Sequence, residues 1–287
     1  MGAQAALPAR LLFDLTKYLN QHSQARLPAL RRKTNIIFIE SDTFGFEAAK
    51  IMKIEELAYH QTPLGDLILR RRSETRLQNK EVFEVKLGDE FLMSSLFTEA
   101  EIELANLGLA ELTGELDVVV GGLGLGYTAV ASLENKNVRS LLVIDKFQEL
   151  IDWHKRKLVP LGEILTEDER CELRTGDFFE LARTGFDVFD NQRKFDAVLL
   201  DIDHSPKHFL DEKNESFYSF EGLESLRRQL KKGGVFALWS NDPPDKEFTK
   251  HLKSIFGKAS AYTIEFANFY TNSTSVNSVY TANFTQI

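Results

Sequence analysis

The sequence predicts an α/β fold in which helices cover both faces of a mostly parallel sheet. From residue 117 onward, segments with the pattern of strands alternate with segments that have the spacing of helices. Several of these strands contain a run of consecutive apolar residues, as in DVVVGG (117–122), SLLVID (140–145) and DAVLLDID (196–203). Strands without polar alternation are typical of parallel sheets that are buried on both faces.

The remaining elements follow in order along the chain. Thr98 and the acidic residues after it predict the start of a helix that runs to about residue 112. Further helices are expected over 127–135, within 147–159, over 219–233 and over 247–257. Further strands are expected over 171–179, where the strand runs into a loop, and over 235–240, 261–266 and 277–284.

The chain before residue 97 has a different pattern. HQTPLGDLILRRR (60–72) contains a turn followed by a strand, and EVFEVKLG (81–88) alternates apolar with polar residues, which predicts antiparallel strands with one wet face. The basic triplet Arg70–Arg72 is expected to be solvated surface. Residues 1–53 carry a helical pattern over 10–21 and a short strand over 36–39. We therefore expect a segment of unknown role over 1–53, a small antiparallel β-domain over 54–97 and the α/β domain over 98–287.

The composition of the chain argues against several classes of function, including nucleic-acid binding and insertion into a membrane. Apolar residues make up 43% of the chain, and the net charge is −8, which gives no global field that would attract nucleic acid. Cys171 is the one cysteine, so no disulfide framework is possible within the chain. No apolar run approaches the ~20 residues that span a bilayer, and no secretory signal is visible. We expect a cytoplasmic protein that binds neither nucleic acid nor a membrane.

The strongest motif is VVVGGLGLGYTAV (118–130), in which Gly121, Gly122, Gly124 and Gly126 lie between a buried strand and a helix. Glycine permits positive φ and lets the backbone approach a ligand closely, while the first turn of the helix presents free N–H groups. A tight turn that binds no ligand is the simpler alternative. Four glycines in six residues exceed what a turn requires, so we expect a ligand-binding loop.

Two carboxylates follow the next two strands. Asp145 ends SLLVID, where an acidic residue takes the two ribose hydroxyls of a nucleoside cofactor; capping of the next helix is the simpler alternative. Asp177 follows the third strand, where a carboxylate can accept a hydrogen bond from an adenine amino group. A sugar-binding acid followed by a base-binding acid is the layout of S-adenosyl cofactor sites. Residues 117–240 resemble a class I S-adenosylmethionine-dependent transferase domain, which implies a doubly wound, seven-stranded sheet that ends in an antiparallel strand pair.

Within that superfamily, residues 55–280 most resemble the spermidine synthase family. The resemblance rests on GDEFLMSS, which supplies Asp89 and Glu90, and on LLDIDHSP (199–206), which follows the fourth strand. It implies that Asp89 and Glu90 bind the distant ammonium of a polyamine. It also implies that Asp201 and either Asp203 or His204 act on the attacking amine, and both assignments of the base stay open. Family members are commonly dimers or tetramers, which implies a homo-oligomer.

Three departures from the family bear on the reaction. A tyrosine–histidine–glutamate patch that follows Asp-Glu-Phe in the family is replaced by Met93, Ser94 and Ser95. His204 lies where an ungapped alignment places the second aspartate of the family's strand-four loop. The glycine loop has Leu123 and Leu125 where the family commonly has an acid, which leaves open whether the cofactor is S-adenosylmethionine or its decarboxylated form.

The resulting hypothesis is a transferase that moves an aminopropyl group to a small amine. A small-molecule methyltransferase and a non-catalytic nucleoside-binding protein are the alternatives. No metal is expected, because the histidines and carboxylates of the strand-four loop have no further ligands at structural-site spacing. His154 is expected to lie at the surface or to pack against its neighbours. NDPPD (241–245) is expected to form the turn that leads into a helix.

Overall fold

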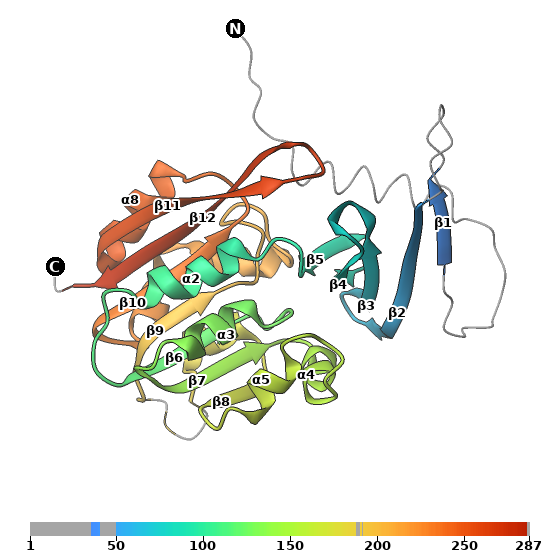
Figure 1. The fold of residues 1–287 in the computed structure, drawn as a ribbon. Helices are drawn as coiled ribbons and strands as arrows, with labels where there is room; N and C mark the ends of the chain where they lie inside the picture. Colours follow the sequence, from blue (N-terminus) through green and yellow to red (C-terminus); the bar gives the residue numbers. More distant parts are fainter. Residues whose placement is uncertain (1–35, 41–49, 188–189, 191, 286–287) are drawn as a thin grey trace, which may run out of the picture. The chain divides into compact units, whose positions relative to one another are not determined.

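The structure is a computed structural model that describes residues 36–40, 50–187, 190 and 192–285. The chain forms two compact units, one up to Leu96 and one from Phe97 onward. The helix expected over 10–21 lies outside the described residues. The predicted fold class is confirmed, with a mostly parallel seven-stranded sheet in the second unit and a smaller antiparallel sheet in the first (Figure 1).

The first unit contains a five-stranded antiparallel meander, in which each strand pairs with the next along the chain. Its strands are β1 (Ile36–Glu40), β2 (Lys50–Thr62), β3 (Gly65–Glu74), β4 (Lys80–Leu87) and β5 (Glu90–Ser94). A short 3-10 helix, η1 (Thr75–Leu77), joins β3 to β4. Leu67 and Leu69 of β3 are buried in alternation, whereas Glu84 to Leu87 of β4 are all buried, so the wet face predicted for 81–88 is wrong.

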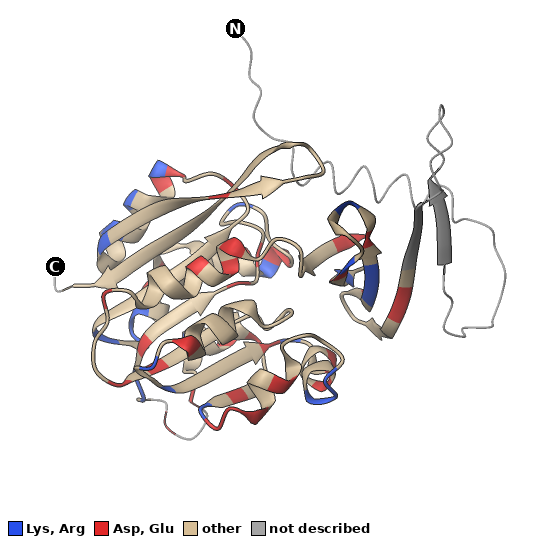
Figure 2. Cartoon of the chain, viewed as in Figure 1, with Lys and Arg blue, Asp and Glu red and all other residues tan. Residues whose placement is uncertain are grey.

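The expectation that Arg70–Arg72 is solvated surface is wrong. The strand register places Arg70 opposite Glu84 on β4 and Arg71 opposite Glu55 on β2. Arg70 and Arg72 both bond to Glu84, which is 4% exposed, and Arg72 also pairs with Glu74. Figure 2 shows this basic stretch of β3 between strands that carry acidic residues. Each carboxylate therefore compensates a guanidinium that the sheet withdraws from water.

The second unit is a seven-stranded sheet in the order β11-β12-β10-β9-β6-β7-β8. Five strands run parallel, namely β6 (Leu116–Gly121), β7 (Val138–Asp145), β8 (Cys171–Thr175), β9 (Phe195–Leu200) and β10 (Leu230–Ser240). The long hairpin of β11 (Gly257–Asn268) and β12 (Ser273–Phe284) is joined to β10 through antiparallel pairing of β12. Residues Val118–Val120 of β6 and Ala197–Leu199 of β9 are fully buried, as the apolar runs predicted.

The helices that pack against the sheet form two groups. Within each group, every helix is in contact with at least one other helix of that group. One group contains α2 (Glu99–Leu109), α3 (Tyr127–Glu134), α4 (Gln148–Lys155) and α5 (Gly162–Glu167). The other contains α6 (Phe178–Thr184), α7 (Phe220–Arg227), α8 (Lys246–Phe256) and the 3-10 helix η2 (Glu212–Tyr218). The second group packs a phenylalanine-rich core against the sheet, including Phe178, Phe217, Phe236 and Phe256.

Several predicted boundaries need correction. The helix expected over 219–233 ends at Arg227, because the Gln229 carbonyl accepts a hydrogen bond from Phe195 N and the chain joins β9 there. Residues 230–234 therefore open β10, with a bulge before Val235. Helices α5 and α6 were not predicted. Thr98 precedes α2 as expected, but its side chain makes no capping hydrogen bond. Asp245 caps α8 through Glu247 N, which confirms the helix entry predicted for NDPPD.

Cys171 begins β8 at one edge of the sheet and is partly buried. Burial raises the pKa of its thiol to about 12. Since the thiolate is the reactive form of cysteine, the raised pKa lowers the reactivity of this side chain at neutral pH.

Among the residues that the structure describes, no helix is long and apolar enough to cross a membrane.

Candidate cofactor and active site

The glycine turn leads directly from β6 into α3, and its backbone requires glycine. Gly122, Gly124 and Gly126 have φ values of 95°, 48° and 95°, a region that other residues rarely adopt. A Cβ on Gly122 would lie 2.0 Å from the carbonyl oxygen of Asp201, and a Cβ on Gly121 would lie 2.4 Å from the ring of Phe178. The turn is therefore pressed against the end of β9, as expected for strands that end at the same edge of the sheet.

Asp145 fastens this turn from the end of β7. Its Oδ2 accepts a hydrogen bond from Leu123 N at 2.9 Å, and its Oδ1 accepts one from Phe147 N at 2.8 Å. The residue is 8% exposed, and burial raises the pKa of its carboxyl to about 6 against the opposing effect of these N–H donors. The predicted ribose acid thus also orders the loop that would surround the ribose.

His154 supports the turn from α4. Its Nε2 lies 3.0 Å from the carbonyl oxygen of Gly124, and its side chain is fully buried. Burial lowers the pKa of this imidazole, so the neutral form is favoured. Packing, one of the two roles expected for His154, is confirmed, whereas a surface position is wrong.

Asp177 lies after β8, as the order of motifs predicted, and caps α6 through Phe179 N at 3.1 Å and Glu180 N at 3.3 Å. Its other oxygen, Oδ2, lies 3.3 Å from Nζ of Lys146, which also lies 3.6 Å from Oδ2 of Asp211. Lys146 is the residue after Asp145. One lysine therefore joins the segments that follow β7 and β8 and the start of η2.

Asp201 directly follows β9 and faces the start of α3. Its N donates to the Gly121 carbonyl at 2.8 Å, and its Oδ2 accepts from Oγ1 of Thr128 at 2.8 Å. The same Thr128 hydroxyl lies 3.2 Å from the carbonyl oxygen of Glu101 on α2. Burial raises the pKa of Asp201 to about 6. Burial and the negative charge of Asp201 raise the pKa of Glu101 well above its ordinary value.

Sequence reasoning missed both Thr128 and Glu101. The acidic residues at the start of α2 were interpreted as a signal for the beginning of a helix, which they also are. One signal could have indicated more: Glu101 lies in the helix that leads into β6, so its side chain can reach the same sheet edge as the glycine turn.

Asp203 and His204 follow Asp201 but differ in their surroundings. Asp203 is 2% exposed and accepts hydrogen bonds from Leu210 N, Asn214 Nδ2 and the Tyr218 hydroxyl. His204 is half-buried, and its carbonyl oxygen accepts a hydrogen bond from Asn241 N at 2.7 Å. The loop after β9 is therefore fastened both to η2 and to the loop after β10.

Further contacts join these two loops. Nδ1 of His208 lies 3.0 Å from Oγ of Ser205 and 3.3 Å from Oδ2 of Asp242. A serine–histidine–aspartate triad needs the serine and the acid on different ring nitrogens. Because both partners share Nδ1 here, this group is a cross-link and not a proton relay.

Solved structures share this architecture. A crystal structure of spermidine synthase in complex with the transition state analogue AdoDATO superimposes with a TM-score of 0.63 and covers 92% of this chain and 84% of that one, at 17% sequence identity. The crystal structure of spermidine synthase from Thermotoga maritima superimposes with a TM-score of 0.62, at 17% identity, covering 92% of this chain and 83% of that one. The chain therefore shares the fold of these spermidine synthases.

Sequence comparison agrees over a shorter span. Polyamine aminopropyltransferases from two strains of Saccharolobus islandicus, Lassen #1 and Kamchatka #1, are 25% identical to the chain over 158 residues, or 53% of its length. The chain spans about half the length of the curated relatives it matches. A comparison with models of protein families finds no match.

Asp89 and Glu90 belong to the first unit of the chain. They lie at the tight turn between β4 and β5, and both are exposed. The adjacent Lys86 is buried beside Phe91, with Nζ 5.2 Å from the centre of the ring. Burial lowers the pKa of Lys86, and the negative charge of Asp89 opposes that effect.

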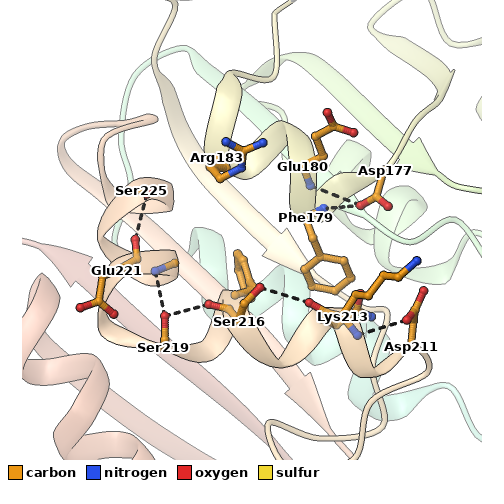
Figure 3. A pocket seen from close by; sticks show the side chains of 13 residues that line it. Asp177, Phe179, Glu180, Arg183, Asp211, Lys213, Ser216, Ser219, Glu221 and Ser225 are labelled. Atoms are coloured by element: carbon orange, nitrogen blue, oxygen red, sulfur yellow. Dashed lines mark hydrogen bonds between the residues drawn. The ribbon is translucent and has the colours of Figure 1, made fainter.

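A pocket of about 500 Å³ lies between α6 and the segment of η2 and α7 (Figure 3). Asp177 and Phe179 contribute to its wall, whereas the glycine turn and Asp201 are not among the described residues that line it. Ser216, Ser219 and Ser225 donate their hydroxyl hydrogens to backbone carbonyls of the same segment. The polar wall of this pocket thus mainly serves the turns of η2 and α7, and the pocket is separate from the glycine turn.

Across the part of the chain that the structure describes, no three His, Cys, Asp or Glu side chains are grouped so that they could hold a metal ion.

Proposed function

We propose that the chain transfers an aminopropyl group from decarboxylated S-adenosylmethionine to a small amine. The names of the sequence relatives and the fold shared with spermidine synthase support this proposal. So does the position of the glycine turn, Asp145, Asp177 and Asp201 at the carboxyl ends of neighbouring parallel strands, where ligands bind in open α/β sheets.

In this proposal the cofactor lies along that edge of the sheet. Gly121, Gly122, Gly124 and Gly126 let the cofactor approach the backbone closely, and the ribose hydroxyls donate to the carboxylate of Asp145, which also accepts hydrogen bonds from Leu123 N and Phe147 N. The adenine amino group donates to Asp177, in competition with Lys146. Asp89 and Glu90 of the first unit bind the distant ammonium of the acceptor.

The observation that carries the proposal is the proximity of two carboxyl groups, Asp201 and Glu101, beside the glycine turn. Burial raises the pKa of each, and the negative charge of Asp201 raises the pKa of Glu101 further. Such a pair stabilises a bound cation and repels an anion. Decarboxylated S-adenosylmethionine ends in an ammonium group alone, whereas S-adenosylmethionine also carries a carboxylate. The pair therefore supplies the acid that Leu123 and Leu125 do not provide within the turn.

The chemistry is a displacement at carbon. The lone pair of a neutral amine attacks the methylene carbon beside the sulfonium, a carbon–nitrogen bond forms, and the carbon–sulfur bond breaks with its electron pair going to sulfur. The products are a thioether nucleoside and a secondary ammonium, which then loses a proton to a base. Alignment of the two reactants can supply about 7–11 kcal/mol of the barrier reduction.

The test is calorimetry with decarboxylated S-adenosylmethionine and with S-adenosylmethionine, followed by a transfer assay with a panel of diamines and polyamines. Tighter binding of the decarboxylated form and formation of an aminopropylated amine are expected. Glu101→Gln is expected to reduce the preference between the two cofactors, whereas Glu103→Gln on the exposed side of the same helix is the matched control.

Each alternative function has its own outcome in these experiments. Preferred binding of S-adenosylmethionine with transfer of a labelled methyl group contradicts the proposal in favour of a methyltransferase. Binding of the nucleosides without any transfer indicates a non-catalytic nucleoside-binding protein. The proposal includes a homo-oligomer as the working form, which light scattering of the purified chain tests directly.

A further inference from the structure

One face of the antiparallel sheet in the first unit carries charged side chains that are withdrawn from water. Arg70 on β3 lies directly opposite Glu84 on β4, and Lys86 follows two residues further along β4. Arg72 and Glu74 continue the same face of β3, because side chains alternate along a strand and opposite residues share a face. The side chain of Arg70 is 19% exposed, and the other four residues are between 4% and 9% exposed.

These five side chains carry three positive charges and two negative ones. Both carboxylates pair with guanidinium groups. Glu84 accepts from Arg70 at 2.5 Å and from Arg72 at 2.8 Å. Glu74 pairs with Arg72 at 2.7 Å. Among the residues that the structure describes, no carboxylate forms an ion pair with Lys86, and no atom accepts a hydrogen bond from its Nζ. The ammonium of Lys86 is therefore the positive charge that this face leaves uncompensated.

Exposed charges around this face do not supply the missing partner. Glu56 on β2 and Lys80 on β4 lie on the same face, are exposed and have opposite signs. Asp89, in the turn after β4, attracts the ammonium of Lys86 from a distance, but it is exposed as well. Water screens exposed charges strongly, so none of these groups compensates a buried ammonium as a direct partner does.

An aromatic ring compensates the charge of Lys86 in part. Its Nζ lies 5.2 Å from the centre of the Phe91 ring, and Cζ of Arg70 lies 4.9 Å from the same centre. Two cations thus share one ring and repel each other. Burial lowers the pKa of Lys86, and the positive charge of Arg70 lowers it further. An anion that reaches this ammonium would stabilise its charged form.

The strand β5 adds a second polar group without a partner. It is the last strand of the meander (Figure 1). Phe91 lies opposite Lys86 and Ser94 lies opposite Glu84, so both side chains belong to the charged face, and both residues are partly exposed. The hydroxyl oxygen of Ser94 is buried and has no hydrogen-bond partner among the described residues. An ammonium and a hydroxyl, both hydrogen-bond donors, therefore lie without acceptors near the outermost strand.

We propose that this face of the first unit binds a monocarboxylate, which accepts hydrogen bonds from the ammonium of Lys86 and the hydroxyl of Ser94. The class of ligand follows from the charge. One negative charge neutralises the five side chains, whereas a phosphate dianion would leave an excess beside Glu84. A carboxylate also has two oxygens, so each donor receives its own acceptor. The site lies within the first unit and does not depend on the proposed transfer reaction.

Thermal unfolding of the full chain tests the site with acetate as the probe. Sodium chloride is replaced by sodium acetate up to about 0.2 M at constant ionic strength. A ligand that binds only the folded state raises Tm, and a rise of about 2 °C or more is expected for the natural chain. Salts also change stability by general effects, so the comparison between variants decides the result.

Lys86→Met keeps the apolar stem of the side chain and removes the ammonium. Without acetate, this variant is expected to unfold about 2 °C or more above the natural chain, because an uncompensated buried charge is gone. With acetate, it is expected to show no specific rise in Tm. Lys80→Met removes an exposed ammonium from the same face of β4, so it is the matched control and is expected to keep the acetate response. Ser94→Ala is expected to lose about half of the rise or more, and it tests the site even if Lys86→Met does not fold.

Three results would overturn the proposal. Equal acetate responses in the natural chain, Lys86→Met and Ser94→Ala would show a general salt effect and no site. A lower Tm of Lys86→Met without acetate would show that the ammonium is already compensated. Sodium phosphate at the same ionic strength is expected to give a smaller rise than acetate. A larger rise with phosphate that disappears in Lys86→Met would overturn the assignment to a monocarboxylate.

Discussion

The hydroxyl of Thr128 donates a hydrogen bond to Oδ2 of Asp201 over 2.8 Å, which joins the helix after the glycine turn to the loop after β9. The threonine also places its oxygen 3.2 Å from the carbonyl oxygen of Glu101. Three segments, α2, α3 and the loop after β9, therefore meet at the side chain of Thr128. Burial disfavours the ionised form of the carboxyl groups of Asp201 and Glu101 and so raises the pKa of both.

Binding of a cationic cofactor tail beside Asp201 and Glu101 is expected to release protons. An ammonium favours the ionised carboxylates, so it lowers the pKa of groups whose pKa is raised in the free protein. Calorimetry at pH 6 in buffers with different ionisation enthalpies measures the number of protons released. Glu101→Gln is expected to reduce that number. Identical binding enthalpies in all buffers would contradict the prediction.

Replacement of Asp145 by asparagine is expected to loosen the glycine turn. The new amide would place N–H groups against Leu123 N or Phe147 N, which leaves buried donors without acceptors. The expected loss in the free energy of unfolding is about 1–3 kcal/mol, with weaker nucleoside binding. Urea denaturation and calorimetry measure the two effects. Asp152→Asn, on the exposed face of α4, is expected to change stability by less than about 0.5 kcal/mol.

Gly122→Ala is expected to destabilise the folded protein much more than Gly233→Ala. Both positions have positive φ, 95° and 81°, so both variants incur a backbone cost of roughly 1–2 kcal/mol. At Gly122 the new methyl group would also lie 2.0 Å from the Asp201 carbonyl, whereas nothing lies within 4 Å at Gly233. Thermal unfolding of the two variants isolates the steric part. Equal destabilisation would show that the turn can move away from β9.

Asp117 is expected to stabilise the fold at pH values above the acidic range, where its carboxylate is ionised in both the folded and the unfolded chain. Burial would raise the pKa of its carboxyl, but hydrogen bonds from Arg139, Ser140 and Lys231 outweigh burial and lower that pKa. The unfolded chain then binds a proton more readily than the folded one. The stabilisation is complete above the unfolded pKa of about 3.9 and is lost as the pH falls toward the folded value.

Urea unfolding of the natural chain and of Asp117→Asn between pH 3 and pH 6 checks this sign. The difference in the free energy of unfolding between the two proteins is expected to shrink as the pH drops below 4. A difference that stays constant over the whole range would show that Asp117 contributes by packing alone.

The fold class and the glycine turn were predictable because their signals are local. The apolar runs of the strands, the glycines after β6 and the carboxylates that end β7 and β9 are each contained within a few neighbouring residues. The order of strands along the sheet brings them to one edge, which parallel pairing requires.

Other features depend on contacts that sequence patterns do not record. The burial of Arg70 and Arg72 follows from a strand register that places glutamates opposite them. Asp203 is enclosed by donors from an irregular segment and a 3-10 helix, neither of which has a hydrophobic period to reveal it. The nearness of Glu101 to Asp201 depends on how α2 packs beside α3.

The raised pKa and partial burial of the Cys171 thiol bear on how the chain can be labelled. Because the natural Cys171 is partly buried and burial raises the pKa of its thiol to about 12, a cysteine introduced at an exposed site is expected to react faster with maleimide dyes than Cys171 does. Leu64 in the first unit and Ile164 in the second are 40% and 50% exposed and offer such sites. Fluorescence energy transfer between dyes at these two positions would report any motion between the units when a nucleoside binds.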